Sequence, residues 1–139
     1  MTTTETRAEP TDEVDIPTDD TPTLGQLLME SAQSGRGRAA AQALAEEGTI
    51  LARDNVRAAL VVKEDGRLRA NWEGLMGRVY TLGLDEGERA FLGLVLSMVG
   101  IGITPLIAIE DLDERRLLIL MRALPLLGGN ERIAVGTRL

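Results

Sequence analysis

The stretch of sequence that decides the fold spans residues 85–127 and reads DEGERAFLGLVLSMVGIGITPLIAIEDLDERRLLILMRALPLL. Within it, residues 90–109 form a run of 20 without a single charge. A short acidic break at residues 110–114 separates this run from a second apolar run that begins at Leu117. No other part of the chain is as apolar, and the burial of apolar surface is the main driving force of folding. We therefore expect residues 85–127 to form the centre of the core.

The uncharged run contains residues that start and stop helices. Asp85 opens a capping box, which predicts a helix that begins just after it. Gly100, Gly102 and Pro105 then interrupt the run, because glycine and proline disfavour a continuing helix. The sequence therefore predicts a central helix over about residues 86–99, which is apolar nearly all round and so is expected to be buried.

The acidic break marks the start of the next helix. Asp111 and Glu114 have the spacing of another capping box, which predicts a helix that begins there and ends near Pro125. This second helix is also apolar over most of its surface. A domain of this size has few elements with which to cover two such helices, so an uncovered apolar face would mark an interface.

An alternative is that the uncharged run enters a membrane. Residues 90–109 have the length needed to cross a bilayer. Against this, a helix broken at Gly100 and Pro105 would expose unpaired backbone groups to lipid, at a cost of several kcal/mol each. We therefore favour burial inside protein, and keep a membrane-associated protein that uses residues 90–109 as the second alternative function.

The charges of the 139-residue chain are unevenly distributed. Residues 1–22 hold seven acidic side chains and one arginine, a net charge of −6, and few apolar residues. Such a composition cannot bury enough surface to fold, so we predict a disordered acidic tail over residues 1–22 and a single globular domain over residues 23–139. The start of the sequence lacks the pattern of a signal peptide, and the composition is typical of bacteria, so we expect a cytoplasmic protein.

The residue types limit the possible chemistry. The chain has no Cys and no His, which excludes thiol and imidazole catalysis and the usual zinc sites. The acidic residues 110–114 are better explained as helix caps than as a metal site. The sequence predicts no catalytic residues, no cofactor, no metal site and no small-molecule substrate, and we expect that the protein is not an enzyme.

The rest of the pattern predicts a mainly helical α+β fold with about five helices. Thr23 and Gln26 form a capping box for a first helix, and a second is expected over residues 38–47. Asn71 is placed to cap a third, and the two described above complete the set. We expect these helices to surround the central one.

A β-hairpin is predicted over about residues 58–71. Asp65-Gly66 suits a tight type I′ turn, and apolar and polar residues alternate on both sides of it. Ile133 and Val135 also alternate with small or polar residues, which predicts a C-terminal strand able to extend the hairpin into a three-stranded sheet.

One segment suggests contact with nucleic acid. Residues 52–60 read ARDNVRAAL. They resemble the recognition helix of winged helix-turn-helix repressors, in which the pattern Ser-Arg-x-Thr-Val-Arg-x-Ala-Leu is common, although Ala52 and Asn55 replace the two hydroxyl residues. The resemblance implies that Arg53, Asn55 and Arg57 face the major groove of DNA and that the hairpin is a wing. The same segment can also form a short amphipathic helix or a hairpin strand with solvated arginines.

These observations favour a non-enzymatic function. We expect a protein-interaction or assembly protein that uses an apolar helix surface to bind a protein partner or a second copy of itself. The first alternative is a small DNA-binding transcriptional regulator that uses residues 38–69, with Arg53, Asn55 and Arg57 as its nucleic-acid-binding residues.

Overall fold

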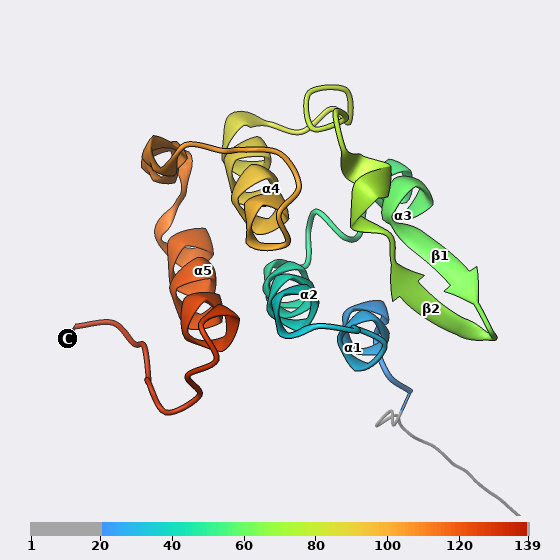
Figure 1. Ribbon diagram of the computed structural model, residues 1–139. Helices are drawn as coiled ribbons and strands as arrows, with labels where there is room; N and C mark the ends of the chain where they lie inside the picture. The colour runs from blue at the N-terminus through green and yellow to red at the C-terminus, as the bar shows by residue number, and fades with distance from the viewer. Residues whose placement is uncertain (1–20, 139) are drawn as a thin grey trace, which may run out of the picture.

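The computed structural model describes residues 21–138, so residues 1–20 of the predicted acidic tail lie outside the described part of the chain. The described residues form a mainly helical α+β fold, as predicted, with one two-stranded antiparallel sheet. The hairpin and the carboxyl-terminal segment lie at opposite edges of the helical body (Figure 1). The elements in chain order are α1 (Leu24–Glu30), α2 (Gly35–Glu47), α3 (Asp54–Leu60), β1 (Val61–Glu64), β2 (Arg67–Ala70), η2 (Trp72–Leu75), α4 (Glu86–Met98), η3 (Leu106–Asp111) and α5 (Glu114–Leu127).

The core is built around two helices rather than one. α4 is buried over most of its length, as predicted, with Phe91 and Leu92 fully enclosed. However, α2 has the more central position, because it packs against α1, α4 and α5. Its inward face is mostly alanine, and small side chains let neighbouring helices approach closely. A Cβ atom added to Gly25 of α1 would lie only 2.4 Å from Cβ of Ala45.

The first two helices begin with side-chain caps. Thr23 and Gln26 form the capping box predicted for α1. α2 begins at Gly35, earlier than the predicted start at residue 38, because the Ser34 hydroxyl accepts a hydrogen bond of 3.0 Å from the N–H of Gly37. The glycine- and arginine-rich residues 35–38 therefore form the first turn of α2.

The predicted hairpin is present, although residues 58–60 belong to α3. β1 and β2 pair with Val61 opposite Ala70 and Glu64 opposite Arg67. The turn residues Asp65 and Gly66 have φ angles of 53° and 76°, as a type I′ turn requires.

The predicted C-terminal strand is wrong. Residues 131–138 form no regular element, and the sheet keeps two strands. The segment leaves α5 at the edge of the body opposite the hairpin, so neither strand is within its reach (Figure 1).

The helix predicted after Asn71 is also wrong, since only the short 3-10 helix η2 forms there. Gly77 adopts a φ of 74°, which a continuing right-handed helix does not allow. Gly74 is needed for a different reason: a Cβ at this position would lie 1.9 Å from the carbonyl oxygen of Ala59, so η2 packs directly on the backbone of α3.

Residues 85–127 do not form one continuous helix, and the break falls at Gly100, Gly102 and Pro105, as predicted. α4 starts with the predicted capping box at Asp85 and ends at Met98. A loop over residues 99–105 then leads into η3. The cap of α5 is Asp113 rather than Asp111, because Asp111 belongs to η3, and α5 continues past Pro125 to Leu127.

Residues 90–109 therefore do not form the single helix that the membrane-associated alternative requires. Among residues 21–138, none of the helices has both the length and the apolar character needed to cross a membrane.

Candidate functional site: an apolar groove between α4 and α5

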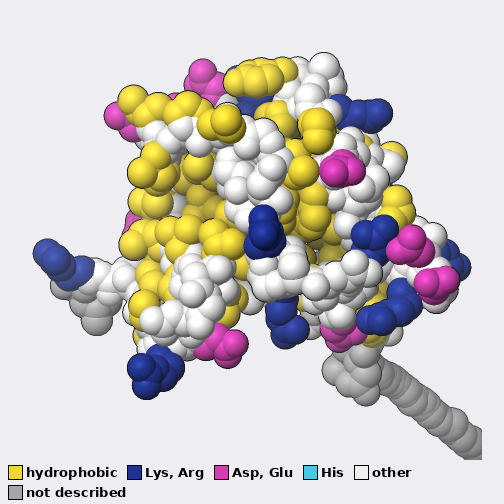
Figure 2. Space-filling model, viewed as in Figure 1, with side chains coloured by type: hydrophobic (Ala, Val, Ile, Leu, Met, Phe, Trp, Pro, Cys, Tyr) yellow, Lys and Arg dark blue, Asp and Glu magenta, His cyan; other side chains and the backbone are white. Residues whose placement is uncertain are grey.

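An apolar groove of about 270 Å³ lies between α4, η3 and α5. Its walls are aliphatic and methionine side chains, and only Ser97 and Thr104 contribute polar groups. In Figure 2 hydrophobic side chains gather around a hollow on this side of the molecule. The lining residues are Leu94, Ser97, Met98, Thr104, Leu106, Ile109, Leu117, Leu120, Met121, Leu124 and Leu127.

The groove exists because the loop before η3 is held against α4. Gly93 allows this approach, since a Cβ added there would lie 2.7 Å from Oγ1 of Thr104. The N–H of Thr104 also donates a hydrogen bond of 3.1 Å to Oγ of Ser97. With the loop fixed on α4, η3 stands apart from the carboxyl-terminal half of α5 and leaves the space between them open.

Large apolar side chains border this space without being covered. Leu106 and Ile107 of η3 are 74% and 67% exposed, and Met121 and Leu124 of α5 are 44% and 53% exposed. We call these four side chains and the groove beside them the η3–α5 apolar surface. An exposed apolar cluster around a hollow is typical of a surface that binds a protein partner.

α5 is held in place by a buried carboxylate of α2. The Glu47 side chain is fully buried and lies 2.9 Å from Nη2 of Arg116 and 3.3 Å from Nη2 of Arg115. It also accepts hydrogen bonds from Thr49 and from the N–H of Ile50. Burial by itself would raise the pKa of Glu47, but the hydrogen bonds and the Arg116 charge outweigh it and hold the pKa below its ordinary value. The opposite face of α5 is thereby kept outward.

The three residues predicted to bind nucleic acid are bonded within the protein. Arg53 precedes α3 and forms an ion pair of 2.8 Å with Glu88 of α4. Nδ2 of Asn55 donates a hydrogen bond of 2.8 Å to the carbonyl oxygen of Leu82. Arg57 donates to the carbonyl oxygens of Leu51 and Ala52 and pairs with Asp54. α3 does lead directly into the hairpin, as the resemblance implied, but Arg53 and Asn55 connect α3 to other segments and Arg57 bonds to the turn before its own helix.

The acidic break contributes caps to the fold. Asp113 accepts a hydrogen bond of 2.7 Å from the N–H of Arg116 and lies 3.5 Å from its guanidinium. Over the described residues, no group of three or more carboxylates is arranged to hold a metal ion.

The sequence indicated a surplus of apolar helix surface but not its location. By composition alone Leu106 and Ile107 would be assigned to the core, because they belong to the uncharged run. The sequence signal that could have located this surface was Pro105, because it ends the loop and starts η3 as a separate short element. Comparisons with known proteins add nothing to this picture: no family model, no curated protein and no solved structure matches the chain.

Proposed function

We propose that this chain is a non-enzymatic assembly protein, and that two copies associate through the η3–α5 apolar surface. The observation that carries the proposal is the exposure of four large apolar side chains around one apolar groove. Covering them would remove apolar surface from water, at about 25 cal/mol for each Å² buried.

A second copy is favoured over an unrelated partner because the surface can complement itself. Leu106 lines the groove and is still 74% exposed, so its side chain protrudes at the rim. In a two-fold arrangement, the same patch meets its own copy, so each protruding side chain can enter the hollow of the other chain. A surface that carries both the protrusion and the hollow needs no second kind of partner.

The test is the molar mass of the full chain by sedimentation equilibrium over a range of concentrations. We expect reversible association in the unmodified chain and its loss in Leu124→Glu, which places a charge in the surface. Ile133→Glu is the matched control, because Ile133 is also an exposed aliphatic residue but lies beyond α5. A monomer at every concentration, or equal association in both variants, would remove the proposal.

DNA binding is the second candidate. What favours it is the succession of α3, β1 and β2, which is the order of a recognition helix and a wing. What weighs against it is the internal bonding of Arg53, Asn55 and Arg57. Retardation of duplex DNA at low salt that is lost in Arg53→Ala and Arg57→Ala would favour this candidate, and no retardation at micromolar protein would exclude it.

A further inference from the structure

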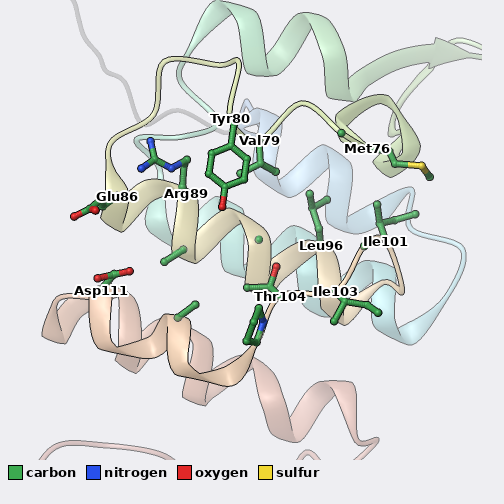
Figure 3. Close-up of a pocket in the computed structure, with 16 residues that line it drawn as sticks. Met76, Val79, Tyr80, Glu86, Arg89, Leu96, Ile101, Ile103, Thr104 and Asp111 are labelled. Atoms are coloured by element: carbon green, nitrogen blue, oxygen red, sulfur yellow. The ribbon is translucent and has the colours of Figure 1, made fainter.

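A second cavity lies on the other side of the loop that precedes η3. It occupies about 450 Å³ between α4, the turn at residues 76–80 and the segment from Ile101 to Asp111. This volume is within the range of sites that hold small molecules, about 300–1,000 Å³. Figure 3 shows its lining side chains converging from three separate segments of the chain.

The cavity has two chemically different ends. Glu86 at the start of α4 and Asp111 at the end of η3 lie together at one end (Figure 3). Leu96, Ile101 and Met76 line the opposite end. A ligand that fills the cavity must therefore have an apolar body and one polar group.

The charge of that polar group follows from the partners of the ionised side chains. Within the described residues, neither the Glu86 nor the Asp111 carboxylate has an ion pair or a side-chain hydrogen bond. The one cation in the lining, Arg89, is already engaged: Nη1 donates a hydrogen bond of 2.8 Å to the carbonyl oxygen of Leu84, and its guanidinium lies 5.3 Å from the centroid of the Tyr80 ring. These contacts are with uncharged groups and leave the charge of Arg89 in place, so the two carboxylates and one guanidinium give the lining a net charge of −1, which favours a positive charge on the ligand.

We propose that this cavity binds a small organic cation, a primary amine that carries an aryl or alkyl body. The ammonium group lies between Glu86 and Asp111, and the body packs along α4 over Ala90 and Gly93, which line the cavity one and two turns further on. This site does not depend on self-association, because the groove between α4 and α5 lies on the other side of the loop.

The test uses three probes with one body and different head groups, namely 4-phenylbutylamine, 4-phenylbutanol and 4-phenylbutyrate. Each is titrated into the ¹⁵N-labelled full chain, and the amide signals of Ala90, Gly93 and Ala108, which line the cavity and not the groove, are followed. We expect saturable shifts at these three residues with the amine, and binding of the alcohol and the carboxylate that is at least about fivefold weaker.

The double variant Glu86→Gln, Asp111→Asn should weaken amine binding to the level of the alcohol. Glu110→Gln is the matched control, since Glu110 lies next to Asp111 on η3 but does not line the cavity, and it should bind the amine as the unmodified chain does. Absence of amine binding, equal binding of the three probes, or unchanged binding in the double variant would overturn the proposal. Repeating the titration with Leu124→Glu separates this result from the test of self-association.

Discussion

Around α3, charged side chains are bonded to the protein itself, whereas around α5 large apolar side chains face the solvent. Arg53 pairs with the buried Glu88, and Arg57 donates to two backbone carbonyls. Leu106, Ile107 and Leu124, by contrast, are more than half exposed. Residue type alone suggests the reverse arrangement, with the charged side chains in the solvent and the apolar side chains in the core. In this comparison the apolar side chains are the ones that no part of the described protein covers, whereas Arg53 and Arg57 already have partners within it.

The largest effect is expected where a charge is most buried. Glu47→Ala removes the carboxylate that joins α2 to Arg115 and Arg116 and leaves the N–H of Ile50 without its partner. We expect the free energy of unfolding to fall by about 3–5 kcal/mol, as for other broken buried ion pairs. Urea denaturation monitored by circular dichroism measures it. A loss below about 1 kcal/mol would mean that Glu47 does not fix α5.

Two leucines one turn apart on α5 offer a matched pair of truncations. Leu120 is 6% exposed, whereas Leu124, further toward the carboxyl-terminal end of the same face, is 53% exposed. Leu120→Ala should lower the free energy of unfolding by about 2–5 kcal/mol because it leaves a cavity in the core. Leu124→Ala should change it by about 0.5 kcal/mol or less in dilute solution, where copies are apart. Equal losses from urea denaturation would contradict the claim that α5 is uncovered at Leu124.

The junction of α3 and α4 should show an intermediate effect. Glu88→Ala removes the acceptor for Arg53 and for the N–H of Asp85, and we expect a loss of about 1–3 kcal/mol. Glu86→Ala is the control on the same helical turn, and should cost about 1 kcal/mol or less, because Glu86 is exposed and stabilises the fold only through the helix dipole, whatever ligand it binds. If both variants unfold at the same urea concentration, the Arg53 pair does not hold the junction.

The smallest effect concerns pH. The pKa of Glu47 in the folded protein is lowered from the ordinary value of 4.5, so its stabilising contribution is fully present above that pH and is lost as the pH falls through the lowered value. The difference in free energy of unfolding between the unmodified chain and Glu47→Gln should therefore shrink between pH 5 and pH 3. A difference that stays constant or grows on acidification would contradict the lowered pKa.

Local signals in the sequence predicted much of the fold. The capping boxes at Thr23 and Asp85 and the turn at Asp65-Gly66 act within a few residues, so they could be identified without knowledge of the tertiary structure. The failures involve distant partners. The absence of a C-terminal strand depends on where α5 ends relative to the hairpin, and the close approach of Gly74 to Ala59 depends on how η2 packs on α3.

The sequence predicted the kind of candidate site, an apolar interaction surface, but not its position. The surplus of apolar helix surface followed from the length of residues 85–127, but its position depends on the contact of Gly93 with Thr104, which sequence alone does not reveal. For Arg53 and Asn55 the pattern indicated the helix, while their partners Glu88 and Leu82 lie far along the chain. The partners of Arg57 lie within residues 51–54 and depend on the local turn before α3.

The most direct test of the central claim is the distance between two copies at the η3–α5 apolar surface. The chain has no cysteine, so Glu110→Cys places a single spin label on the exposed side of η3 without altering the apolar side chains. Glu64→Cys, at the tip of the hairpin, is the control. Dipolar electron spin resonance should show label-to-label coupling at position 110 that disappears on dilution with unlabelled protein, and none at position 64. Coupling at position 64 alone, or at neither position under conditions where the chain associates, would contradict the account.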